Sequence, residues 1–159
     1  MLEQALGIAL TRVDYWNLAD AAWEITPGMH RLDFGVDLTF GPVTVGVTWS
    51  SPGQRLDVQP LSIGPSLSDA VDVDVSGTYP WSRIVGRPLH AVVGRHAEGP
   101  SNEVGGPFRW AVACRFEESA TVWLAAANYL DPPGVLLPFG DELIVIHDLA
   151  VANQLGLEV

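Results

Sequence analysis

The sequence predicts a mainly β protein of the α+β class, in which an antiparallel sheet of about eight or nine strands folds into a sandwich or an open barrel. Two observations lead to this prediction. Several short segments alternate apolar with polar residues, which is the period of a half-buried strand, and clusters of Gly, Pro, Asn and Asp separate them. Short helices are predicted only at the N-terminus, in the centre and at the C-terminus. The length of 159 residues fits a single domain, residues 1–159.

The first third of the chain contains an N-terminal helix and a clear hairpin. Leu2 to Leu10 carries apolar residues at helical spacing, and Thr11 to Trp16 then reads as a strand. From Arg31 to Phe40 every second residue is apolar, and the alternation resumes from Val43 to Trp49. Because only Gly41-Pro42 separates these two segments, we expect them to pair through a tight turn.

Shorter elements follow in the middle of the chain. Arg55 to Gln59 is a short strand that ends at Pro60, and Ala70 to Ser76 alternates valines with polar residues. Pro80 suits the first position of a short helix, which Gly86 can end. Pro88 to His96 is another predicted strand.

The last third predicts a second hairpin, an interior strand and a helix. Phe108 to Phe116 alternates regularly, Glu117 to Ser119 forms a turn, and Thr121 to Tyr129 returns. Leu143 to His147 is apolar on both faces, as expected for a strand that is covered on both sides. Asp148 is placed to cap a short helix that runs to Leu155, with Gly156 just beyond its end.

Charge narrows the classes of partner. The chain has 19 acidic and 8 basic residues and a formal net charge of -11, so it should repel nucleic acid and anionic lipid and attract basic proteins. The longest apolar stretch without charge, Ser119 to Leu130, is too short to span a membrane, and Met1-Leu2-Glu3-Gln4 lacks the basic start of a secretory signal. With the single Cys114, these features predict a cytoplasmic protein without membrane contact.

No cofactor, metal site or catalytic residue is predicted. His90 and His96 lie on one strand but about 20 Å apart, too far to share an ion. His30 and His147 have no partner at ligand spacing, although the fold could bring His147 near the acidic residues that precede and follow it. Cys114 shares the parity of core residues, where a thiol is inert, and no serine lies in a nucleophile-elbow motif.

The leading functional hypothesis is a non-enzymatic module that binds and neutralises a basic protein. In size and charge the chain is similar to small acidic bacterial immunity proteins, but no residue motif carries the similarity. Trp123 has the opposite parity to its neighbours and would be a binding anchor if it were exposed. The candidate partner-binding residues are Asp69, Asp72, Asp74, Glu117, Glu118 and Trp123.

Two alternatives stay open. The chain could be a small-molecule-binding or catalytic β domain with an aromatic-lined apolar pocket and polar groups such as His90, Asp72 or His147 at its mouth. It could also be a homo-oligomer in which sheet edges pair and Trp123 is buried at a two-fold interface. A deep pocket would favour the first alternative, whereas carboxylates gathered on one face beside an exposed aromatic residue would favour the leading hypothesis.

Overall fold

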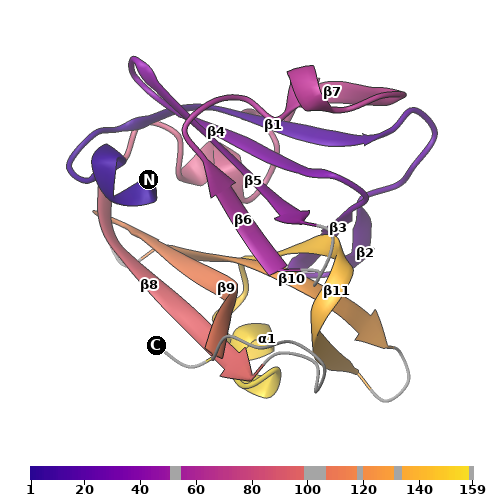
Figure 1. The fold of residues 1–159 in the computed structure, drawn as a ribbon. Coiled ribbons are helices and arrows are strands. Elements are labelled where there is room, and N and C mark those ends of the chain that lie inside the picture. The colour runs from indigo at the N-terminus through magenta and orange to yellow at the C-terminus, as the bar shows by residue number, and fades with distance from the viewer. Residues whose placement is uncertain (51–54, 99–106, 118–119, 131–133, 158–159) are drawn as a thin grey trace.

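The computed structural model describes residues 1–50, 55–98, 107–117, 120–130 and 134–157. It is mainly β, with two antiparallel sheets that pack face to face, as Figure 1 shows. The described residues form more strands than the eight or nine expected, because a short strand went unrecognised and one predicted strand is divided between the sheets.

The first sheet has five strands in the order β6-β5-β4-β1-β7. The predicted hairpin is confirmed: β4 and β5 pair with Phe40 opposite Val43, and Gly41 at the turn has a φ of 53°. This left-handed conformation is one that glycine adopts without strain. The strands are β1 (Leu10–Leu18), β4 (Gly35–Phe40), β5 (Val43–Ser50), β6 (Arg55–Gln59) and β7 (Ala70–Asp74).

The second sheet has six strands in the order β2-β3-β11-β10-β9-β8. Its β9–β10 hairpin is also confirmed, with Trp123 opposite Ala113. Only the end of β11 was predicted, because a bulge beside Gly140 interrupts the apolar pattern of its first half. The strands are β2 (Glu24–Thr26), β3 (Met29–Leu32), β8 (Leu89–Glu98), β9 (Pro107–Phe116), β10 (Thr121–Leu130) and β11 (Val135–Ile146).

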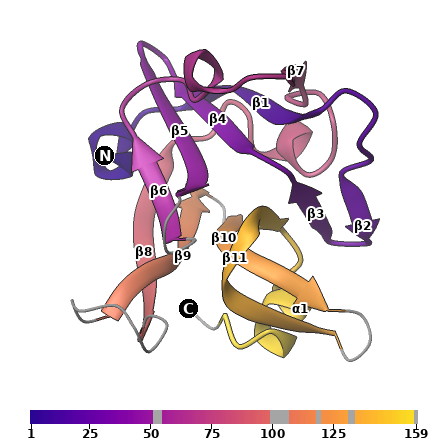
Figure 2. The same cartoon turned by 45° about the vertical axis from the view of Figure 1, so that its right-hand side comes forward.

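The predicted strand from Arg31 to Phe40 passes from one sheet to the other. It ends as β3 at Leu32 and resumes as β4 at Gly35, and Figure 2 shows β3 at the end of the molecule where this crossing occurs. The amide of Asp33 donates to the Asn17 side chain at 2.9 Å within the crossing. Gly35 is required here because a Cβ would lie 2.3 Å from the backbone oxygen of Val47. The alternation survives the crossing because both strands turn the same apolar face towards one core.

Backbone hydrogen bonds also join the two sheets near the N-terminus. The amide of Gly7 donates to the carbonyl of Leu89 at 2.8 Å, and that of Leu10 donates to Arg87 at 3.0 Å. The start of β1 is therefore tied to the start of β8. The sheets are thus connected at this corner as well as through the β3–β4 crossing.

The helices are fewer and shorter than predicted. The N-terminal and central segments form only short 3-10 turns, η1 (Leu2–Ala5) and η3 (Trp81–Arg83), and a further turn is η2 (Gly64–Ser66). Gly7 and Gly86 have φ values of 78° and 93°, which stop a helix soon after each turn. The α-helix found in the described residues is α1 (Leu149–Gln154), and no helix there is long and apolar enough to cross a membrane.

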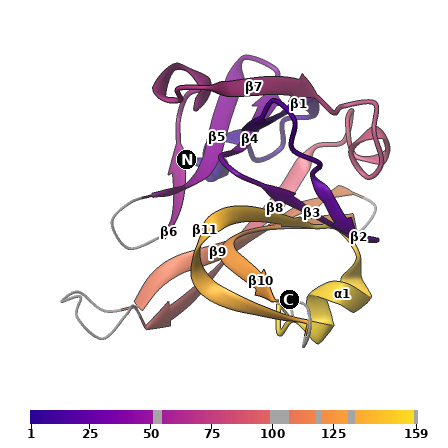
Figure 3. The same cartoon turned by 90° about the vertical axis from the view of Figure 1, so that its right-hand side faces the viewer.

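Apolar side chains form two clusters on opposite faces of the six-stranded sheet. The larger lies between the sheets and includes Phe40 and Phe116, whose rings stack with centroids 6.5 Å apart. The smaller covers the outer face and includes Trp123, together with Ala152 of α1 and Leu157. Figure 3 shows α1 on the side of this sheet away from the other sheet. The two-sided coverage explains why the end of β11 is apolar on both faces, as predicted.

Replacing Gly140 by Ala should destabilise the fold by about 3 kcal/mol. A Cβ at this position would lie 2.1–2.5 Å from backbone atoms of Ala127 and Asn128, which cannot rotate away. Gly77→Ala is the matched control, since a Cβ there meets nothing within 4 Å, and it should change stability by less than about 0.5 kcal/mol. Urea unfolding of both variants measures the difference, and equal stabilities would show that the bulge is not packed as described.

Candidate functional site

The residues predicted to bind a partner do not form one surface. Asp69, Asp72 and Asp74 are exposed on or beside β7, an edge strand of the five-stranded sheet. Glu117 is exposed at the end of β9 in the other sheet, and Glu118 lies outside the described residues. The carboxylates are therefore spread over separate parts of the molecule.

Trp123 does not meet the condition of exposure under which it would be a binding anchor. It faces away from Val122 and Leu124, as its parity predicts, but only 1% of its surface is exposed. Its ring is covered by the outer cluster, which includes residues of α1 and the segment after it. The chain itself therefore buries this side chain, without the two-fold interface that the oligomer alternative proposed.

Some carboxylates on the acidic face beside β7 form hydrogen bonds or ion pairs within the protein. Arg12 makes a bidentate contact with Asp14 at 2.7–2.9 Å and lies 4.0 Å from Asp74. Asp37, 4% exposed, accepts from the Trp16 indole at 2.8 Å and from the amide of Ile63 at 3.0 Å. These contacts hold the segment around η2 on the outer face of the sheet, so Asp37 is not available to a partner.

The fold brings together two histidines that the sequence spacing left apart. His30 lies opposite Val145 in the β3–β11 pair, and His147 follows β11 directly. Their ring centroids are 5.0 Å apart, and the Tyr79 ring lies 5.2 Å from that of His147. By contrast, His90 and His96 are exposed on the edge strand β8.

A buried hydrogen-bonded chain supports His30. The Trp81 indole donates to the hydroxyl oxygen of Tyr15 at 2.7 Å, and that hydroxyl lies 2.8 Å from His30 Nδ1. Because an indole N–H can only donate, the Tyr15 hydroxyl proton is free to be donated to Nδ1 of a neutral imidazole. Burial lowers the pKa of His30 to about 4, with a smaller contribution from His147, and burial raises the pKa of Tyr15. The network therefore holds a neutral histidine at neutral pH.

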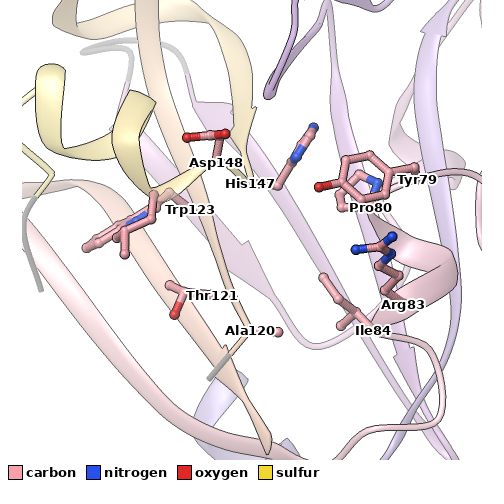
Figure 4. Close-up of a pocket in the computed structure, with 10 residues that line it drawn as sticks. Tyr79, Pro80, Arg83, Ile84, Ala120, Thr121, Trp123, His147 and Asp148 are labelled. Carbon is pink, nitrogen blue, oxygen red and sulfur yellow. The ribbon is translucent and has the colours of Figure 1, made fainter. Parts of the chain in front are cut away.

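A pocket of about 180 Å³ opens beside this network. Tyr79, Pro80 and Arg83 form one wall, Trp123 and Thr121 face them across it, and His147 lies at its edge (Figure 4). Tyr79 is 56% exposed, so the pocket reaches the surface. The remaining lining residues are Ile84, Ala120, Asp148 and Leu149.

Trp123 and Arg83 give this pocket its polar character. The Trp123 Nε1 atom is buried, and no described residue accepts its hydrogen bond. Arg83 is exposed and lies with its guanidinium carbon 5.3 Å from the centre of the Tyr79 ring. Asp148 is already engaged, because its Oδ1 accepts from the amides of Ala150 and Val151 at 2.8 and 3.1 Å and so caps α1 as predicted. The pocket thus combines aromatic walls with hydrogen-bond donors.

The described residues do not place three or more His, Cys, Asp or Glu side chains where they could hold a metal ion. Cys114 is fully packed between the sheets, and burial raises the pKa of its thiol to about 12. A protonated, inaccessible thiol is a poor nucleophile. The pocket is therefore the strongest candidate for a functional site in the part of the chain that the structure describes.

The lowered pKa of His30 makes a testable link between pH and stability. Unfolding returns this pKa from about 4 to about 6.5, so the unfolded chain binds an extra proton between these values and stability falls as the pH drops through them. His30→Gln should remove close to one proton from the pH dependence of unfolding between about pH 6.5 and 4.5. Urea unfolding across this range measures it, with the exposed His96→Gln as control. An unchanged slope in His30→Gln would contradict the assignment.

Comparison with known proteins identifies no relative of this chain. No protein-family model, no curated protein and no solved structure matches the chain. The function must therefore be argued from the residues of the pocket and from the charged surface.

Proposed function

We propose that the pocket between Trp123 and Tyr79 binds a small, partly apolar molecule that carries a hydrogen-bond acceptor. The observation that carries the proposal is the Trp123 indole N–H, which is buried at the pocket without an acceptor among the described residues. A buried donor without a partner costs about 1–3 kcal/mol. A ligand that supplies an acceptor would offset that cost. Since Nε1 is buried, the acceptor must enter the pocket to reach it.

The size of the pocket limits the ligand to a fragment. A cavity of about 150 Å³ accommodates benzene, so the space of about 180 Å³ here suits one ring with a short substituent. Pro80, Ile84 and Leu149 supply apolar contacts, and Trp123 and Tyr79 lie on opposite sides of the opening. Such a lining favours a flat apolar body over a sugar or a peptide.

Binding fits the site better than catalysis. Asp148, the carboxylate of the pocket lining, is used as a helix cap, so it is not positioned as a free general base. The buried Tyr15–His30 pair is not part of the pocket lining. We therefore propose a binding protein and assign no reaction to it.

Acetophenone, a neutral flat ketone, is a suitable first probe. It should bind with a Kd of about 1 mM, as expected for a fragment of this size, and shift the Trp123 indole resonance in an NMR titration. Trp123→Phe keeps an aromatic ring but removes the N–H, so it should weaken binding about 5-fold or more. Trp110→Phe, in the same outer cluster but outside the pocket lining, should bind normally.

The titration can also refute the proposal. If the Trp123 resonance stays fixed up to about 10 mM acetophenone, or if both Trp variants bind equally well, the pocket does not use this donor. The resonance itself is identified by its loss in Trp123→Phe.

We retain binding of a basic protein in the cytoplasm, in the manner of an immunity protein, as a second proposal. The observation in its favour is that Asp69, Asp72 and Asp74 are exposed on or beside β7, whose outer edge has no strand partner among the described residues. A basic extended segment could add to this edge and pair its charges with the carboxylates. The buried Trp123 has no part in this version of the proposal.

Two double variants distinguish binding at the β7 carboxylates from a general effect of net negative charge. Poly-L-arginine should bind the protein in low salt, and Asp72→Asn with Asp74→Asn should weaken that binding by about 5-fold or more. Glu117→Gln with Asp57→Asn removes two exposed carboxylates elsewhere and is the control. Equal losses in the two double variants, measured by titration calorimetry, would show that only net charge matters.

A further inference from the structure

The charged residues around the pocket indicate the chemical class of its ligand. This inference rests on the proposed function, that the pocket binds a small molecule. We infer that the ligand is a small aromatic monocarboxylate. Arg83 holds the carboxylate of this ligand on the side of the pocket where Tyr79 also lies. The apolar body of the ligand extends towards Trp123 on the opposite side.

Arg83 is the cation that lines the pocket, and it has no ion-pair partner among the described residues. Arg95, Arg109 and Arg115 likewise make no ion pair among the described residues, and what sets Arg83 apart is its place in the pocket lining. Arg12 and Arg31 do contact carboxylates, at 2.7 Å and 3.6 Å. The planar fork of a guanidinium matches the two oxygens of a carboxylate, so an unpaired Arg at a pocket favours an anionic group with that geometry.

The aromatic residues argue against a cationic ligand. Aromatic walls often bind ammonium groups through their ring faces. Here the guanidinium of Arg83 already lies over Tyr79 at 5.3 Å, and that of Arg95 lies over Trp123 at 6.0 Å. A cation in the pocket would face the charge of Arg83 and would find both rings already in contact with cations.

Asp148 determines which way the ligand points. Its carboxylate lines the pocket on the side away from Arg83, as Figure 4 shows, and it would repel a ligand carboxylate placed there. The two donor groups of the site are therefore used differently. Arg83 contacts the charged end near the surface, and deeper in the pocket the Trp123 N–H donates to the face of the ligand's aromatic ring, whose π electrons accept the hydrogen bond.

Three probes of similar size and different charge test this inference. Phenylacetate should bind about 10-fold more tightly than acetophenone, and phenethylamine should bind more weakly than either. Arg83→Gln should weaken phenylacetate about 10-fold and leave acetophenone within about 2-fold. Arg109→Gln removes the same charge outside this pocket and should leave all three affinities nearly unchanged.

The outcomes separate this inference from the proposed function. If acetophenone binds but phenylacetate binds no more tightly, or if Arg83→Gln and Arg109→Gln have equal effects, the carboxylate inference is wrong and the pocket proposal stands. Tightest binding of phenethylamine would overturn the inference in favour of a cation site. If none of the probes shifts the Trp123 resonance, both proposals fail.

Discussion

Two buried hydrogen bonds of the Tyr15 hydroxyl hold the two sheets and the segment between them together. Tyr15 comes from β1 in the first sheet and is fully buried, yet it contacts His30 on β3 in the second sheet and Trp81 on η3. One hydroxyl thus joins both sheets and the connection between them. A hydroxyl that accepts one hydrogen bond and donates another satisfies all three polar groups in a place that water does not reach. Losing any member would leave a buried polar atom without a partner, which costs more than the hydrogen bond itself contributes.

The same contact sets the position of the pocket. Trp81 is held by Tyr15, and it fixes the start of η3, next to Tyr79 and Pro80, which form one wall. His30 packs against His147, which follows β11 and precedes α1. The opposite wall comes from Trp123 on the outer face of the second sheet, beside the first turn of α1. The pocket therefore lies where three segments meet that are far apart in the chain, and a rigid buried network supports one side of it.

The composition suggests one acidic binding surface, but the structure distributes the acidic residues differently. The excess of carboxylates is not gathered on one surface: Asp37 is buried by hydrogen bonds, Asp14 binds Arg12, and Asp148 caps a helix. What distinguishes the pocket is instead the positive charge of Arg83 in its lining, which has no carboxylate partner among the described residues. In a protein of net charge -11, a basic side chain in a pocket thus says more about the ligand than the many acidic side chains on the surface do.

Local sequence patterns were enough to predict the mainly β class, both hairpins, the cap at Asp148 and the inward direction of Cys114, because alternation and capping depend on neighbours within a few residues. They also placed Trp123 on the face opposite Val122. Only the tertiary structure decided that this face is covered, that Arg31 to Phe40 divides between two sheets, and that His30 meets His147. Alternation is the same whether a strand stays in one sheet or crosses to another, and it does not say what packs on either face. The pocket escaped prediction for the same reason, since strand pairing and the docking of α1 bring its walls together across large separations in sequence.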